Sequence, residues 1–311
     1  MLKRFSVLPI LSLILLSGCR SDPVWGADFG CKAAAAYGNY DSAVLRITRA
    51  TKNPEVREKL KERPNAAAYY LRVLAISEQY RGNLKESEIA FRESKKHQAH
   101  PLTSFACARF ALRSGGIAAA EKEIAEMEKL LAENRPCDFN YYDFLLALVP
   151  GERHDQMLRM PKSEFLRSRL DWLKRELAAI RKLPGGCLPV LSGIPLPGAE
   201  KIRYGMKRAN LPPELGNPAR TESLRINKHA MEGLIGYFYV LPDGKRAVCL
   251  AVSKQTDRLG KIFLLSWPPG KKQGAGWLRK ENQPYVIGNV SPPKEAHESK
   301  AGKMTGSYSH H

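Results

Sequence analysis

Three glycine-led turns in the first half of the chain constrain its fold more than any other feature of the sequence. They begin at Gly38, Gly82 and Gly115. Five positions after each glycine stands a small residue, namely Ala43, Ser87 and Ala120. A large apolar residue follows four positions later, at Ile47, Phe91 and Ile124. A small or flexible residue comes three positions after that, at Ala50, Ser94 and Met127. Glycine permits the sharp turn between two antiparallel helices, and small side chains let helices approach closely. The pattern therefore predicts three helical hairpins.

The spacing of these turns resembles that of the tetratricopeptide repeat. Gly82 and Gly115 are 33 residues apart, close to the ~34-residue period of that family. The family's first-helix and closing positions are matched by Leu71, Leu74, Ala75 and Pro101. On this resemblance, residues 31–134 form three repeats, with an insertion of roughly ten residues between the first two. An irregular helical bundle is the alternative interpretation.

Helical patterning continues to residue 183. An apolar stripe at three- and four-residue steps is formed by Leu166, Leu170, Leu173, Leu177 and Ile180. Basic residues occupy the other faces, so this helix is expected either to pack against the hairpins or to lie on a membrane surface. The predicted helical repeat domain covers residues 31–183.

A break in composition follows. Residues 184–198 contain four prolines and four glycines, which predicts a linker before a small β-rich domain at residues 199–290. The expected strands cover residues 234–241, 247–252, 261–267 and, as a fourth, 285–290, with a helix near residues 222–231. The polar tail at 291–311 is predicted to be disordered. The predicted fold class is α+β, a helical repeat array followed by a small antiparallel sheet.

A short apolar run at the N-terminus predicts export. Residues 5–16 are apolar and follow Lys3 and Arg4, whereas a membrane-spanning helix needs about 20 apolar residues. A basic start, a short apolar core and small residues after it are typical of a secretory signal. We expect a signal peptide at residues 1–18 and a short tether at 19–30.

The end of this run, Leu16, Ser17, Gly18 and Cys19, resembles the bacterial lipobox. In that motif the chain is cut before the cysteine, which is then acylated. The resemblance implies that Cys19 carries lipid, and each buried CH₂ of an acyl chain contributes about 0.8 kcal/mol to anchoring. An ordinary signal peptide with an incidental cysteine is the alternative. Arg20 stands where lipoproteins of the inner membrane often have aspartate, which favours the periplasmic face of the outer membrane.

The composition is that of a basic globular protein. The formal net charge is +19, with 26% charged and 43% hydrophobic residues, which excludes a wholly disordered chain. The basic excess is denser after residue 183. It suits contact with anionic lipid or with an acidic partner, and the export signal argues against nucleic acid as a partner.

Five cysteines follow Cys19. They are Cys31, Cys107, Cys137, Cys187 and Cys249. Disulfides persist in an exported chain, and an odd number leaves at least one thiol free. A bridge between Cys187 and Cys249 is the preferred pairing, because it would join the start of the C-terminal part to its clearest strand.

No motif predicts catalysis, a metal site or a cofactor. The sequence contains no HExxH or GxSxG, and its Gly-Lys pairs lack the spacing of a phosphate loop. His97 and His100 are interpreted as exposed polar residues at a helix end rather than as metal ligands. If the β-rich part were an enzyme, Tyr237, Tyr239 and Trp267 would be expected to line its pocket.

Together these features predict a membrane-anchored envelope lipoprotein that acts as an interaction scaffold and not as an enzyme. Lipoproteins with tetratricopeptide-like repeats commonly serve outer-membrane, pilus or secretion assembly, and the resemblance implies partners of that kind. Repeat arrays bind partners on one surface, here predicted around Tyr70, Arg72, Arg109 and Arg113. Two alternatives stay open: a structural tether to the cell wall or an anionic membrane surface, and an envelope enzyme.

Overall fold

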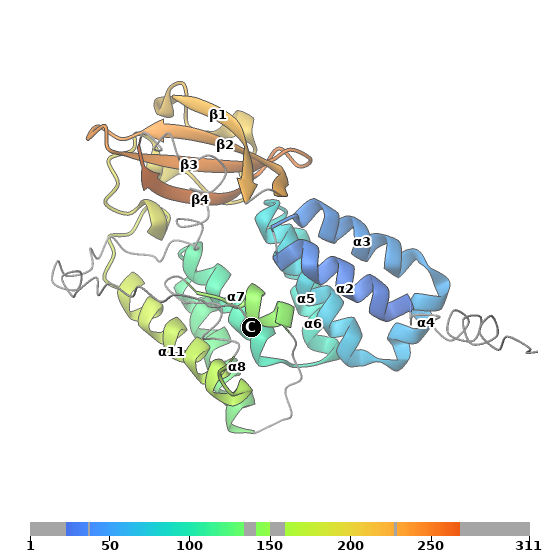
Figure 1. The fold of residues 1–311 in the computed structure, drawn as a ribbon. Helices are drawn as coiled ribbons and strands as arrows, with labels where there is room; N and C mark the ends of the chain where they lie inside the picture. The colour runs from blue at the N-terminus through green and yellow to red at the C-terminus, as the bar shows by residue number, and fades with distance from the viewer. Residues whose placement is uncertain (1–22, 37, 134–140, 150–158, 227–228, 268–311) are drawn as a thin grey trace, which may run out of the picture.

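The computed structural model describes residues 23–36, 38–133, 141–149, 159–226 and 229–267. The predicted signal peptide, Cys19, Cys137, the strand expected at 285–290 and the tail at 291–311 lie outside these ranges. Within them, a helix-rich part is followed by a four-stranded antiparallel sheet (Figure 1). The predicted α+β class is confirmed.

The helices form three successive hairpins. Their bounds are α2 Pro23–Ala36, α3 Tyr40–Lys52, α4 Pro54–Glu62, α5 Pro64–Tyr80, α6 Leu84–His97, α7 Pro101–Arg113, α8 Ile117–Ala132, α9 Tyr141–Leu146 and α11 Lys162–Ile180. Helix α2 packs on α3, α5 on α6 and α7 on α8. The turns lie at Gly38, Gly82 and Gly115, whose φ angles of 81°, 76° and 77° favour glycine. The three predicted hairpins are therefore present, with α4 between the first and the second.

The shared positions of the sequence pattern are the contact positions of the hairpins. All nine residues predicted to pack are buried: Ala43, Ile47, Ala50, Ser87, Phe91, Ser94, Ala120, Ile124 and Met127. The Ser87 hydroxyl donates to the carbonyl of Ala75 at 2.8 Å, and Ser94 donates to Ala68 at 2.6 Å. Each serine thus lets α6 approach α5 closely and satisfies its own buried hydroxyl.

Two local predictions in this part are wrong. The tether was expected at 19–30, but helix α2 begins at Pro23. Proline suits the first turn of a helix, and the Ala-rich end of α2 has high helix propensity. His100 is buried rather than exposed. Its Nδ1 accepts the backbone N–H of Leu102 at 3.1 Å, which caps α7.

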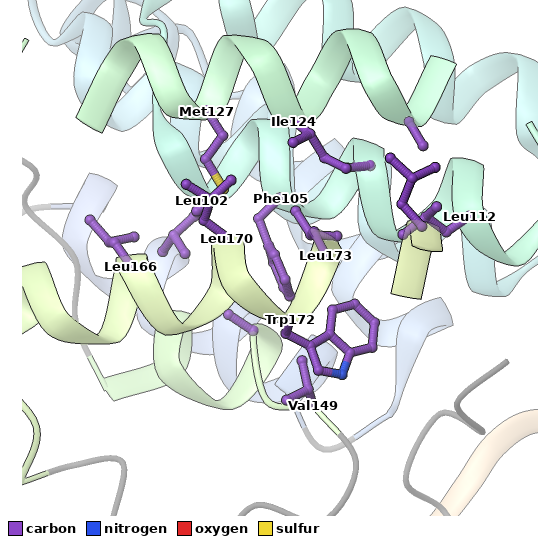
Figure 2. Close-up of a cluster of buried hydrophobic side chains, with 14 of the residues drawn as sticks. Leu102, Phe105, Leu112, Ile124, Met127, Val149, Leu166, Leu170, Trp172 and Leu173 are labelled. Atoms are coloured by element: carbon purple, nitrogen blue, oxygen red, sulfur yellow. The ribbon is translucent and has the colours of Figure 1, made fainter. Parts of the chain in front are cut away.

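Helix α11 packs its apolar stripe onto the last hairpin. Figure 2 shows Leu166, Leu170 and Leu173 directed at Leu102 and Phe105 of α7, in the cluster that also contains Met127 of α8. All five residues of the predicted stripe are buried. The packing alternative is therefore confirmed. Of the helices in the described ranges, none combines the length and apolar character needed to cross a bilayer.

The sheet has the strand order β1-β2-β3-β4. The strands are β1 Arg220–Ile226, β2 His229–Val240, β3 Arg246–Ser253 and β4 Leu259–Ser266. The last three correspond to the three strands expected within the described ranges, although β2 and β4 begin earlier and end one residue sooner than expected. The helix expected at 222–231 is wrong, since this stretch forms β1 and the start of β2. Pairing of β1 along β2, from Arg220 opposite Phe238 onward, supplies a tertiary context that outweighs weak helix propensity.

Both faces of the sheet are covered. Along β3, Ala247, Cys249 and Ala251 belong to the cluster shared with the helices, and we call this side the first face. Val248, Leu250 and Val252 point to the second face. The alternation follows from the two-residue period of a strand.

The second face is covered by the segment that was predicted to be a linker. Leu188, Leu191, Ile194 and Leu196 are all buried against it. The same face is covered further along the chain, up to residue 219, by residues such as Leu211 and Leu215, and we call residues 184–219 the covering segment. Four short 3₁₀ turns lie in it, the first within the predicted linker: Pro189–Leu191, Ala199–Lys201, Arg208–Asn210 and Pro213–Leu215. Its prolines exclude regular helix or central strand, but the apolar residues between them still bury. The linker prediction is therefore wrong.

The sheet and the helices share one core. A single cluster of buried side chains contains Tyr80 and Phe91 from the helices and Phe238 and Phe263 from the sheet. At the turn between α5 and α6, a Cβ on Gly260 would lie 1.9 Å from the carbonyl oxygen of Tyr80. The β4 backbone thus lies directly on this turn, and the predicted division into two separate domains does not describe the packing.

Arg81 fixes the same contact through hydrogen bonds. Its Nε donates to Asp41 of α3 at 2.7 Å, and its Nη2 donates to Gln255 of the β3–β4 loop at 2.8 Å. The Thr256 hydroxyl donates to the Arg81 carbonyl at 2.5 Å. Two helices and one loop are therefore joined at one guanidinium.

Candidate binding site

The first helices of the hairpins bind a segment of the same chain. Arg109 on α7 donates to the carbonyls of Leu148 at 3.1 Å and Leu146 at 3.0 Å. Arg72 on α5 pairs with Asp143 on α9 at 2.6 Å, and both side chains are buried. Residues 141–149 thus lie on the face that the repeat resemblance assigns to a partner.

This arrangement bears on the four residues predicted to bind a partner. Tyr70, Arg72 and Arg109 are buried, at 1%, 4% and 6% exposure. They contact the protein's own interior and are not on its surface. Arg113 is the exception, since it stays partly exposed. Asp143 was missed, although a lone acid in the apolar stretch YYDFLLALVP was a signal for a buried cation partner.

Arg113 lies one helical turn after Arg109 on α7 and belongs to a second cluster of side chains. Its guanidinium carbon lies 5.3 Å from the ring centre of Tyr80 and 5.0 Å from that of Tyr204. Its Nη2 donates to the Tyr204 hydroxyl at 3.4 Å. The Lys261 ammonium of β4 lies 4.2 Å from the Tyr80 ring and 5.0 Å from the Tyr40 ring. We call Tyr40, Tyr80, Arg113, Tyr204 and Lys261 the junction cluster.

The cluster lies where three parts of the chain meet. Tyr40 and Tyr80 stand at the turn ends of α3 and α5, and their rings stack at 4.6 Å. Lys261 is on the first face of the sheet, opposite Ala251. Tyr204 comes from the segment that covers the second face. The tertiary fold, rather than any local motif, brings these residues together.

The cations strongly affect the phenols. Burial alone would raise the pKa of Tyr80, but Arg109, Arg113 and Lys261 outweigh it and lower this pKa to about 7. Burial raises the pKa of Tyr40 well above its usual value, with the neighbouring Tyr80 adding to the rise.

The cations are affected in turn. Burial lowers the pKa of Lys261 to about 8, against the opposing effect of Tyr80 and with the help of Arg113 and Arg109. Burial also acts to lower the pKa of Arg113, but Tyr204 and Tyr80 raise it above its ordinary value. Arg113 therefore keeps its charge, while Lys261 and Tyr80 titrate near neutral pH.

No carboxylate within the described ranges balances these charges. The groups that act on Arg109, Arg113 and Lys261 are phenols and other cations. The nearby acids of α3 and α5, Asp41 and Glu78, bond to Arg81 instead. The junction cluster thus concentrates positive charge beside aromatic rings.

A separate groove opens on the outer side of the first hairpin. It has a volume of about 430 Å³ and lies along α3 and the start of α4; its lining residues are Ser42, Leu45, Arg46, Arg49, Ala50, Asn53 and Val56. Leu45 is 49% exposed, an unusual state for a large apolar side chain on this protein. The groove therefore offers an apolar contact beside two cations, Arg46 and Arg49.

The preferred disulfide is not formed. Cys187 and Cys249 are both free thiols. Cys249 is buried in the middle of β3 on the first face, where burial raises its pKa well above the usual value. Cys187 directly precedes Leu188, which packs on the second face. The sheet therefore separates the two sulfurs.

The residues named for an enzymatic pocket do not come together either. Tyr237 and Tyr239 contribute to the second face, whereas Trp267 packs near Phe238 on the first face, with ring centres 6.1 Å apart. In the part of the chain that the structure describes, no group of three potential metal ligands is found. No protein-family model, curated protein or solved structure matches this chain.

Sequence reasoning missed most of the junction cluster, although two signals were present. Lys261 alternates with Phe263 and Leu265 in its strand, so a cation occupies a position that faces the core. Tyr40 and Tyr80 each lie two residues from a turn glycine, at Gly38 and Gly82. Only the docking of the sheet onto these turns places the three side chains together.

Proposed function

We propose that this protein is a lipid-anchored scaffold of the bacterial cell envelope that holds a partner protein on its helical hairpins. The anchor is the lipid on Cys19, at the periplasmic face of the outer membrane. The hairpins are tetratricopeptide-like units, and the partner belongs to an outer-membrane, pilus or secretion assembly.

The observation that supports this proposal most is the open groove along α3 and α4. An exposed Leu45 beside Arg46 and Arg49 suits a partner segment that carries an apolar side chain and acidic neighbours. The face of α5 and α7 is occupied by residues 141–149, so the groove is the better candidate surface. It replaces the surface predicted around Tyr70, Arg72 and Arg109.

The position of the groove agrees with an anchored protein. Helix α2 begins at Pro23, four residues after Cys19, and four extended residues reach at most about 14 Å. Helix α2 also contacts α4. A lipid on Cys19 would therefore hold this end of the helical part close to the bilayer, where assembly proteins of the envelope are met.

The test is capture of partners by the full-length chain after crosslinking in intact cells. The groove variant combines Arg46→Glu with Arg49→Glu. The control combines Lys85→Glu with Lys122→Glu, two exposed lysines on other hairpins. We expect a defined set of envelope proteins with the native chain and the control, and its loss with the groove variant.

One result would contradict the groove as the partner surface, and another would contradict the scaffold itself. Equal recovery of partners by both variants would move the partner surface elsewhere. Recovery of lipid or cell-wall polymer alone would favour the tether. A Cys19→Ser variant tests the anchor separately, since it should move the protein from the membrane fraction to the soluble fraction.

A further inference from the structure

We propose that the junction cluster is a binding site for an oxyanion, the phosphate or carboxylate group of a small ligand. Arg113 and Lys261 bind the negative group, and the rings of Tyr80 and Tyr204 form the walls beside it. This proposal is independent of the scaffold function, because none of these residues lines the groove on α3 and α4.

The first argument is the convergence of charge. Arg113, on helix α7, lies over the rings of Tyr80 and Tyr204. Lys261, on strand β4, also lies over the Tyr80 ring. Tyr80 is thus shared by both cations. Like charges that are partly withdrawn from water repel one another, so a negative group held between or beside them would stabilise their convergence.

The second argument is the lack of a carboxylate that pairs with either cation among the described residues. The other buried cations of this region have oxygen partners: Arg72 has Asp143, Arg81 has Asp41 and Glu78, and Arg109 has two carbonyls. For Arg113 the structure gives one hydrogen bond, to the hydroxyl of Tyr204. For Lys261 it gives contacts with aromatic rings, and its three N–H donors have no acceptor among the described residues.

The third argument is access. Tyr40, Tyr80 and Tyr204 are buried, at 6%, 8% and 7% exposure. Arg113 and Lys261 are only partly buried. The two cations thus keep some exposure to solvent beside rings that are buried, so an anion from solvent can reach them.

The residue types fit an oxyanion. A guanidinium presents a planar pair of donors that matches a carboxylate or phosphate, and an ammonium adds a compact point charge. In the unliganded protein, the Tyr80 phenolate competes for the same cations. Tyr80 therefore reports on the site, because a bound anion neutralises the charges that lower its pKa.

The test measures binding of inorganic phosphate and of malonate to the full-length chain by calorimetry, with sulfate as an oxyanion of constant charge for the pH series. Ionisation of Tyr80 is followed in parallel by the near-ultraviolet absorbance of tyrosinate. We expect saturable binding and a rise in the pKa of Tyr80 from about 7 when anion is bound. Sulfate binding should weaken as pH rises through 7 to 8, because Tyr80 becomes a negative phenolate and Lys261 loses its positive charge over this range.

Lys261→Met is the central variant, since it keeps an unbranched apolar chain among the rings and removes the charge. It should weaken binding roughly 10-fold or more and return the pKa of Tyr80 toward 10, its ordinary value. Lys254→Met, at an exposed lysine of the same sheet region, is the matched control and should change neither. Tyr80→Phe should remove the absorbance change, because it removes the titrating phenol. Lys261→Gln also removes the charge, with a polar side chain, and should weaken binding to a similar degree; it covers the case that Lys261→Met does not fold.

Vesicles distinguish the possible sources of the anion. Competition of phosphatidylglycerol vesicles, but not phosphatidylcholine vesicles, with phosphate would identify a lipid headgroup. Competition by neither would identify a free small anion. An absence of saturable binding by phosphate and malonate, or binding unchanged in Lys261→Met, would overturn the proposal and leave the cluster as a structural contact between helices and sheet.

Discussion

At the scale of single residues, the buried arginines show how position decides chemistry. Arg72 neutralises a buried acid, Asp143. Arg109 donates to the carbonyls of Leu146 and Leu148, so it holds a backbone segment in place and does not neutralise an acidic side chain. Arg113 has neither kind of partner, although it lies one turn from Arg109 on the same helix. The same residue type thus serves as an ion-pair partner, a backbone clamp and a candidate ligand-binding group.

Glycine is the other residue that the fold uses in a position-specific way. We expect Gly260→Ala to lower the free energy of unfolding by about 2 kcal/mol or more, because the new Cβ would lie 1.9 Å from the Tyr80 carbonyl oxygen and overpacking against backbone forces elements apart. Gly185→Ala is the control, since a Cβ there meets nothing within 4 Å. Urea unfolding of both variants tests this, and equal stability of the two would contradict the tight contact of β4 on the α5–α6 turn.

At the scale of elements, the hairpins and the covering segment follow different rules. The hairpins are built on a regular pattern, in which Ser87 and Ser94 combine small size with a hydrogen bond to α5. The segment at 184–219 has no such pattern. It packs through isolated apolar residues between prolines and glycines, and its structure depends on the sheet that it covers.

The covering segment gives a direct test of this difference. We expect Leu191→Ala to destabilise the protein by about 2–5 kcal/mol, since removing a fully buried leucine leaves a cavity and Leu191 is 1% exposed. Glu200→Ala, at an exposed position of the same segment, should leave stability unchanged. Thermal unfolding of the two variants checks this. A negligible effect of Leu191→Ala would mean that the segment behaves as a linker after all.

At the scale of the whole molecule, the helices and the sheet form one packed body. The shared cluster on the first face, the backbone contact at Gly260 and the hydrogen bonds of Arg81 all cross the same boundary. The junction cluster exists only because of this boundary. Any change that separates sheet and helices should therefore also abolish anion binding.

The shared core predicts a single unfolding transition. Native-state hydrogen exchange should give the same free energy of opening for peptides from α5–α6 and from β3–β4, because breaking either part exposes the common cluster. Urea titration followed by exchange and mass spectrometry measures both at once. Two separate transitions would instead indicate that the helical part and the sheet are independent units.

Much of the helical part could be predicted from the sequence, because its information is local. The glycines at 38, 82 and 115 place the turns, and the small residues after them place the contacts. The strands around the turn at Pro242 were also predicted, since alternating apolar residues and Gly244 are local signals. By contrast, β1 was missed because its pairing with β2 is what makes it a strand.

The site was harder to predict, and the reason is physical. Arg109 and Arg113 were identified as notable, but sequence pattern cannot tell which face of a helix will be covered by a distant segment. Residues 141–149 cover Arg109, and β4 brings Lys261 to Tyr80. These contacts join positions that are far apart in the chain, so no spacing rule contains them.

The sequence by itself determined the α+β class, the glycine turns and the packing positions of the hairpins, because each rests on propensities and periods that act over a few residues. The tertiary structure alone decided that the Pro- and Gly-rich segment is core, that Cys187 and Cys249 lie on opposite sides of the sheet, and that phenols and cations converge at the junction. Those outcomes depend on which surfaces bury one another, and burial is a property of the whole fold rather than of any segment.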